Sequence, residues 1–178
     1  MATKQDLAIL NSVFNPLVPL GECPVESIVD DELKDDEVLT PSVVESKELE
    51  SNAVKLAEAG RVEEAITILN ESIQISPERP SGYNNRAQAY RLKGNISAAT
   101  KDLDSAIRLS GGTGKSACLA YCQRAIVHRL QGEQKEAVED FKKAAELGSD
   151  FARSQLVQMN PYAALCNQML RKVMSQYQ

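Results

Sequence analysis

Small and aromatic residues recur at helical spacing in the middle of the chain. Tyr83, Ala87 and Tyr90 fall on one face of a helix, because residues three or four positions apart lie one above the other. Gly94-Asn95 then interrupts the pattern. A second apolar series follows at once, at Ile96, Ala99, Leu103, Ala106, Ile107 and Leu109. The pattern predicts two helices joined by a tight turn.

The same unit occurs upstream and downstream of this one. Three pairs of landmarks lie 34 residues apart, namely Gly60 and Gly94, Ala65 and Ala99, and Leu69 and Leu103. A glycine, an alanine and a large apolar residue recur 38 residues after Gly94, Ala99 and Leu103, at Gly132, Ala137 and Phe141. The four extra residues fall in the glycine-rich run 111–114. A shared period in every landmark predicts three consecutive helical hairpins.

Small residues mark the places where the two helices of each hairpin should cross. Alanines stand at these positions in the first helices (Ala53, Ala87, Ala125) and in the second helices (Ala65, Ala99, Ala137). Close approach at alanine lets larger neighbours interlock around the crossing. One hairpin cannot bury its own apolar stripe, whereas three stacked hairpins can. The period, glycines and alanines resemble the tetratricopeptide repeat family, which implies an all-α, right-handed helix-turn-helix solenoid of three repeats.

The expected organisation follows from these units. Repeats are expected at 46–79, 80–113 and 118–150, with a short amphipathic helix and an apolar stretch at 1–21, an acidic mobile linker at 22–45 and C-terminal capping helices at 151–178. The capping region has an apolar stripe after Asn160-Pro161. An outer repeat needs a cover over its apolar face, so capping is the favoured interpretation. A partner-binding amphipathic helix is the alternative.

Negative charge is concentrated before the repeats. Between Glu22 and Glu50 there are 11 acidic residues and two lysines, a net −9, while the remaining residues sum to +4. A solvated, mobile linker is the favoured interpretation for residues 22–40. The alternative is an arm that docks on the positive repeat surface or on a partner, and that shields the peptide groove near Arg91 and Arg129.

Several classes of function are disfavoured by composition. The net charge is −5 and there is no basic run, so no nucleic acid is expected. No stretch approaches the roughly 20 apolar residues of a membrane span. The first residues lack a secretion signal, so the expected location is cytoplasmic, with the nucleus also open. Cys118 and Cys122 are four residues apart, but no second pair follows, and neither a metal nor a cofactor is expected.

Catalytic chemistry is also not expected. The run Gly112-Thr113-Gly114-Lys115-Ser116 ends like a phosphate-binding loop, but Leu109 stands where that motif needs glycine, and a helix rather than a strand precedes it. The single histidine, His128, occupies the position of Leu56 and Tyr90, which favours a packing role. The chain is therefore interpreted as a non-enzyme.

The family resemblance implies a concave groove lined by the first helices. Its register predicts peptide-binding residues at Asn84, Asn85, Gln88, Arg91, Gln123 and Arg129. Amides and guanidinium groups suit an extended peptide, because they bond its backbone and carboxylates. Relatives that bind chaperone tails use a two-carboxylate clamp, whose positions here are Glu50, Val54, Asn85, Leu119 and Gln123. Only Asn85 matches that clamp.

Both ends and the centre of the chain resemble one small group within the family, described as binding the 70-kDa heat-shock chaperone. The matching stretches are 10–16, 83–92 and 160–167. The resemblance implies a non-catalytic adaptor, expected to be a monomer, that associates with this chaperone without a full carboxylate clamp, for example through its ATPase domain. The alternative is a scaffold that stabilises a specific client, such as a metabolic enzyme of amino-acid (tyrosine) catabolism.

Overall fold

The computed structural model describes residues 33–35, 37–160 and 162, and this part of the chain is entirely helical apart from its turns and ends. Its helices are α2 (Pro41–Glu58), α3 (Val62–Ile75), α4 (Pro80–Leu92), α5 (Ile96–Leu109), α6 (Gly114–Gln131), α7 (Gln134–Glu146) and α8 (Asp150–Met159). The expected helix within 1–21 and the capping helix after Pro161 lie outside the described residues.

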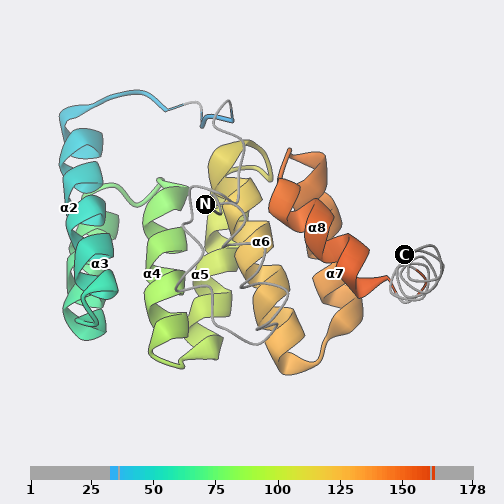
Figure 1. Cartoon of the computed structure of the whole chain (residues 1–178). Coiled ribbons are helices and arrows are strands. Elements are labelled where there is room, and N and C mark those ends of the chain that lie inside the picture. Colours follow the sequence, from blue (N-terminus) through green and yellow to red (C-terminus); the bar gives the residue numbers. More distant parts are fainter. Residues whose placement is uncertain (1–32, 36, 161, 163–178) are drawn as a thin grey trace, which may run out of the picture.

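The helices pack as consecutive antiparallel hairpins (Figure 1). The pairs are α2 with α3, α4 with α5, and α6 with α7, and each pair also packs on the next. The first helices α2, α4 and α6 contact one another in order, so they form one layer of the stack. Helix α8 packs on α7 and covers the end of the third hairpin. The predicted all-α repeat architecture is confirmed.

The core has the alanine crossings that the sequence predicts. All six alanines at the crossings are at most 1% exposed: Ala53, Ala65, Ala87, Ala99, Ala125 and Ala137. Leu69, Leu103 and Phe141 interlock beside them and are also buried. Burying one such large side chain contributes about 1.5–3 kcal/mol. The turn glycines Gly60, Gly94 and Gly132 have φ of 79°, 82° and 81°, a left-handed conformation that favours glycine.

The first helix begins at Pro41, five residues before the expected start of the repeat at Ser46. Thr40 caps it, because its hydroxyl oxygen accepts a hydrogen bond from the Val43 amide at 3.3 Å. Pro41 at the first helical position favours the same start. Residues 41–45 therefore belong to the repeat and not to the linker.

The four inserted residues also extend a helix. Helix α6 begins at Gly114, before the expected start of the third repeat at Cys118, and is 18 residues long against 13 for α4. Gly111, Gly112 and Gly114 all have positive φ and turn the chain sharply into this extension. The insertion thus gives the third repeat a longer first helix, whose third residue, Ser116, is buried.

At the C-terminal side of the third repeat, Ser149 caps helix α8. Asp150, the expected last residue of that repeat, is the first residue of α8. The Ser149 hydroxyl accepts a hydrogen bond from the Ala152 amide at 3.1 Å. No helix in the described part of the chain is long and apolar enough to cross a membrane.

Candidate protein-binding face

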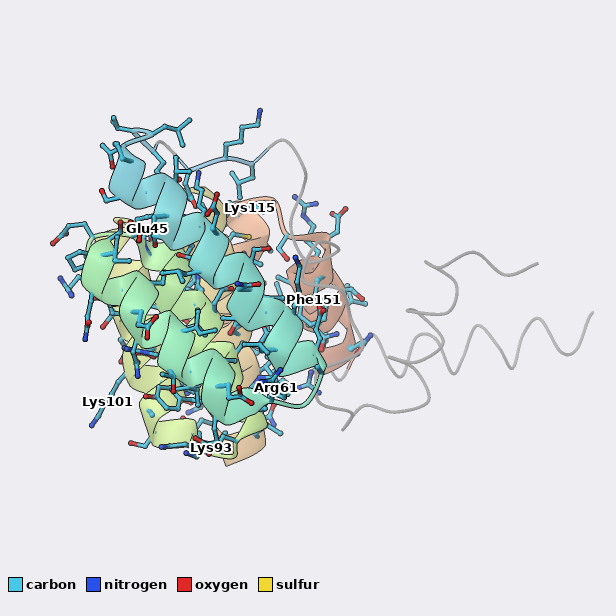
Figure 2. The ribbon with its side chains drawn as sticks, turned by 90° about the vertical axis from the view of Figure 1, so that its left-hand side faces the viewer. Glu45, Arg61, Lys93, Lys101, Lys115 and Phe151 are labelled. Atoms are coloured by element: carbon cyan, nitrogen blue, oxygen red, sulfur yellow. The ribbon has the colours of Figure 1, made fainter. Side chains whose placement is uncertain are left out.

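The candidate site is the outward surface of α2, α4 and α6, called here the first-helix face. Figure 2 shows its two ends: Glu45 and Lys115 lie at the end where these helices begin, and Arg61 and Lys93 lie at the opposite end. The predicted residues are spread along this layer. Asn84, Arg91 and Gln123 are buried, whereas Asn85, Gln88 and Arg129 are half-buried.

Asn84 fastens the second repeat to the third. Its side-chain amide donates a hydrogen bond to the Ser116 carbonyl at 2.8 Å, while its own carbonyl oxygen is buried without a partner among the described residues. With only 3% of its surface exposed, Asn84 is held inside the contact between α4 and α6. The structure therefore places Asn84, which was predicted to line the peptide groove, in the contact between two repeats.

Asn85 is already engaged within the protein. Its amide donates a hydrogen bond to Glu50 Oε2 at 3.2 Å. Glu50 is 6% exposed, and Arg79 donates to its other oxygen at 2.7 Å. Ser46, Ser72 and Ser81 also donate to this oxygen. The carboxylate therefore joins α2, α3 and α4 through a buried polar network.

Burial raises the pKa of Glu50, although Arg79 and the three serine hydroxyls act in the opposite direction. Glu50 stands where clamp-bearing relatives are expected to carry a lysine. The Glu50 carboxylate points inward and is paired with Arg79. Its main effect on the clamp position Asn85 is to accept the hydrogen bond that the Asn85 amide would otherwise donate to a ligand. The one residue that matched the clamp pattern is thus directed at a carboxylate of its own chain.

Two arginines on this layer lack an acidic partner among the described residues. Arg91 is 9% exposed, its Nε has no hydrogen-bond partner in the described part of the chain, and burial lowers its pKa. Within the described ranges, Arg129 donates only to the neutral side-chain carbonyl of Gln155 on α8. Both occupy the last turn of their helices. Two guanidinium groups without carboxylates can accept an acidic group from outside.

Each of these arginines is followed by an exposed leucine. Leu92 is 39% exposed and Leu130 is 57% exposed, and the two occupy equivalent positions 38 residues apart. Val54 of α2, also 39% exposed, lies on the same layer. The first-helix face therefore repeats a cation beside an apolar side chain, an arrangement suited to a peptide with acidic and apolar residues.

The described residues of the acidic segment before α2 are in contact with the repeats. The acidic strap, defined here as residues 33–35 and 37, runs from the start of α2 toward the start of α6 (Figure 1). Asp35 accepts hydrogen bonds from the Ser116 amide at 2.9 Å and from the Ser116 hydroxyl at 2.6 Å. Glu37 pairs with Lys47 at 2.6 Å and with Arg79.

The strap contacts a different place from the one expected for a docking arm. Asp35 lies at the first turn of α6, while Arg91 and Arg129 lie in the last turns of α4 and α6. The described strap residues therefore bind the opposite end of the first helices from the two arginines. Residues 22–32 and 36, the rest of the expected arm, lie outside the described part.

A repeated ion pair was missed by the sequence analysis. Arg86 pairs with Asp102, and Arg124 pairs with Asp140, each through two hydrogen bonds of 2.7 and 2.8 Å. The signal was present, because both pairs are 16 residues apart and the second follows the first by 38. Charged residues at equal offsets in two repeats can be searched for in the same way as apolar landmarks.

The histidine and the two cysteines that the sequence offered as candidates for chemistry contact neighbouring residues of the repeats. His128 Nδ1 lies 2.5 Å from Glu133 Oε2, in a half-buried position. The thiols of Cys118 and Cys122 are buried. Their mutual hydrogen bond lowers the pKa of Cys118 and raises that of Cys122. Among the described residues no cluster of histidine, cysteine and carboxylate side chains could hold a metal ion.

Comparison with known proteins agrees with this geometry. The family model described as tetratricopeptide repeat matches residues 80–112 and 119–150. Among solved structures, the Sgt2 TPR domain from Aspergillus fumigatus is 22% identical with a TM-score of 0.60, and the match covers 75% of this chain and 87% of that one. The first TPR of Spaghetti (RPAP3), bound to the HSP90 peptide SRMEEVD, is 23% identical with a TM-score of 0.58, covering 67% and 93%. At this identity both show the fold alone.

Whole-chain relatives are more similar. Tetratricopeptide repeat protein 36 from Danio rerio is 46% identical, over 98% of this chain and 94% of the relative. The Homo sapiens protein of the same name is 46% identical, over 99% and 96%. The Caenorhabditis elegans protein is 45% identical, over 97% and 95%. The chain therefore belongs to the tetratricopeptide repeat family, and within it to the group of tetratricopeptide repeat protein 36.

Proposed function

We propose that the protein is a non-catalytic adaptor that binds a protein partner and associates with the 70-kDa heat-shock chaperone without a full carboxylate clamp. Structural neighbours bind chaperone tail peptides: the second TPR domain of human RPAP3, in complex with the HSP70 peptide SGPTIEEVD, is 23% identical with a TM-score of 0.57. The shared fold supports a peptide-binding surface in this chain, and the residues on that surface decide the ligand.

The observation that carries the proposal is the contact between Asn85 and Glu50. The Asn85 amide donates to the buried Glu50 carboxylate at 3.2 Å, so it is not free to hold the end of a chaperone tail. Leu119 and Gln123 stand where that clamp needs cations. A peptide ending in Glu-Glu-Val-Asp would bring at least two carboxylates to a surface without the charges that hold them. Association with the chaperone then requires a different contact.

The second contact that we propose is centred on Arg91 and Arg129. Neither arginine has an acidic partner in the described part of the chain: Arg91 is nearly buried, and Arg129 donates to the side-chain carbonyl of Gln155. A guanidinium group in such a place gains more from an incoming carboxylate than an exposed one, since less water screens the pair. Leu92 and Leu130 beside them supply apolar contact area.

The experiment compares the intact chaperone with its tail. Isothermal titration calorimetry should show binding of the full-length 70-kDa chaperone, equal binding of a chaperone lacking its last four residues, and weak or no binding of the free tail peptide. The substitution Asn85→Ala should leave the affinity unchanged. The pair Arg91→Gln with Arg129→Gln should weaken it about tenfold or more.

Another arginine of the chain, Arg61, provides a matched control for the loss of positive charge at Arg91 and Arg129. Arg61 pairs with Glu64 on an exposed turn, so Arg61→Gln should not change the affinity. Micromolar binding of the tail peptide that disappears on Asn85→Ala would overturn the proposal in favour of an ordinary clamp. No binding of the chaperone in any form would favour the client-stabilising scaffold instead.

A further inference from the structure

The four inserted residues of the third repeat build a surface that the other repeats lack. Helix α4 starts with Pro80, which has no backbone N–H to offer. Helix α6 starts with Gly114 and presents the Ser116 amide and hydroxyl to the acidic strap. Its own N-cap residue, Thr113, makes no side-chain hydrogen bond to this turn. The hydrogen-bond acceptor for the first turn of α6 therefore comes from elsewhere in the chain.

That acceptor is a carboxylate 81 residues away in sequence. Asp35 takes three hydrogen bonds from Ser116, two from the amide at 2.9 and 3.2 Å and one from the hydroxyl at 2.6 Å. The fit leaves no room for another side chain, since a Cβ on Gly114 would lie 2.5 Å from the Asp35 carboxylate oxygen. Gly114, at the end of the insertion, and Ser116, two residues after it, thus form a cradle shaped for a carboxylate group.

A second charged contact lies two residues further along the strap. Glu37 pairs with Lys47 of α2 and with Arg79, which is 8% exposed and also holds Glu50. The hydrogen bonds from Lys47 and Arg79 lower the pKa of Glu37 against the opposing effect of burial. The strap is thus held by two carboxylates, separated by one residue, at two places on the edge where the first helices begin.

Neither carboxylate is itself buried in the core. Asp35 is exposed and Glu37 is half-buried, and the residues that follow, Val38 and Leu39, are 81% and 70% exposed. Leu33, the first strap residue, packs against the buried cluster that contains Cys118 and Phe141, so one apolar contact adds to the ionic and hydrogen-bonded contacts of the strap. The ionic and hydrogen-bonded contacts exchange readily with an equivalent segment, because the same groups serve any chain that presents two carboxylates at this spacing.

We propose that the edge formed by Ser116, Gly114, Lys47 and Arg79 is a binding site for an extended acidic segment of a partner protein, and that Asp35 and Glu37 occupy this site in the free protein. The ligand is a stretch with two carboxylates separated by one residue. The strap competes with it as a tethered ligand at an effective concentration in the millimolar range. The site is separate from Arg91 and Arg129, which lie at the other ends of the helices.

The test uses the full chain and a peptide probe. The probe is a fluorescently labelled peptide, Leu-Lys-Asp-Asp-Glu-Val-Leu-Thr, which copies residues 33–40, and its control has alanine at the first aspartate and at the glutamate. Fluorescence anisotropy at low ionic strength should show that the Asp35→Ala/Glu37→Ala protein binds the probe at least tenfold more tightly than the unmodified protein. The control peptide should bind neither.

Two further variants assign the site. In the Asp35→Ala/Glu37→Ala protein, Ser116→Ala and Lys47→Gln should each weaken binding of the probe severalfold, whereas Arg91→Gln with Arg129→Gln should leave it unchanged. The last result also separates this site from the chaperone contact proposed above. Arg79 is not substituted, because it also holds the buried Glu50.

Three results would overturn the proposal. Equal binding of the probe to the modified and unmodified proteins would show that the strap does not occupy its site. Equal binding of the probe and the alanine control would show that the carboxylates are not recognised. Absence of probe binding to every variant, with an unchanged circular dichroism spectrum, would show that the edge holds its strap only as part of the fold.

Discussion

Arg124 and Asp140 face each other across the third repeat through two parallel hydrogen bonds, from Nε at 2.7 Å and from Nη2 at 2.8 Å. The same arrangement joins Arg86 and Asp102 in the second repeat, with the same two distances. The hydrogen bonds to the aspartates raise the pKa of both arginines. The first repeat has Asn52 and Ile68 at the corresponding positions, so the pair is absent there.

Each of these arginines also reaches the preceding repeat. Arg86 donates to Asn70 at 2.8 Å, and Arg124 donates to Asp104 at 2.6 Å. The guanidinium of Arg124 also lies over the Tyr121 ring, 5.6 Å from its centroid. One side chain therefore ties a first helix to its own second helix and to the second helix before it.

Removal of this arginine should destabilise the stack. Arg124→Met leaves Asp140, whose side chain is 5% exposed, without its bidentate partner. Leaving a buried charge uncompensated costs about 3–5 kcal/mol, and the partial exposure of Arg124 reduces this to about 2–3 kcal/mol. Urea unfolding followed by circular dichroism measures the change. Arg124→Lys should not restore stability, since an ammonium group cannot form both bonds.

The exposed pair of Arg61 and Glu64 supplies the control for that experiment. Both side chains are more than half exposed, so Arg61→Met should leave the urea midpoint unchanged. A midpoint for Arg124→Met equal to that of the unmodified protein would show that the paired geometry contributes nothing to stability.

Bulk at the alanine crossings should also destabilise the fold. Ala87 is 1% exposed and Ala99 is fully buried, and each lies where two helices approach closely. Ala87→Leu and Ala99→Leu should each cost about 1–3 kcal/mol through overpacking. Lys101→Leu introduces a leucine at an exposed position of α5 and should have little effect. Thermal melting that is unchanged by both alanine substitutions would contradict the register of the repeats.

The buried Glu50 should make stability depend on pH. Its pKa is raised above 4.5 in the folded protein by burial, while the unfolded chain should titrate near the ordinary value. Ionisation is therefore harder in the folded state, so the contribution of Glu50 to the free energy of unfolding falls as the pH rises through this window. Glu50→Gln, of nearly the same shape, is the reference.

The measurement is the free energy of unfolding of both proteins between pH 4 and 7. The value for the unmodified protein minus that for Glu50→Gln should decrease as the pH rises, and then become constant above the folded pKa. An increase over the same range would mean that the attraction of Arg79 outweighs the cost of burial.

Glu37 should show the opposite dependence. Lys47 and Arg79 lower its pKa below 4.5 in the folded protein, so its ionised form stabilises the strap. This contribution is fully present above the unfolded pKa and is lost as the pH falls through the lowered folded pKa. The stability difference between the unmodified protein and Glu37→Gln should therefore be present at pH 7 and vanish in acid. A difference that persists at pH 2 would assign it to packing.

The sequence alone determined the repeat architecture of this protein, because that architecture depends on local and periodic features. Helical spacing of Ala87 and Tyr90, the turn at Gly94 and the period of 34 residues each act within one hairpin or between neighbours. A whole-chain resemblance added the expected partner. The start of the first repeat was expected at Ser46 because residues 41–45 were assigned to the acidic linker. Thr40-Pro41 is a helix-start signal, and α2 begins there.

Only the tertiary structure decided how Glu50 and Asp35 are paired. Glu50 meets Arg79 and Asn85 because α2, α3 and α4 converge there, and no local pattern reports the direction of a long side chain. Asp35 meets Ser116 across 81 residues because the strap returns along the edge of the stack. Such contacts depend on the path of the chain in space, whereas a helical stripe depends only on spacing along it.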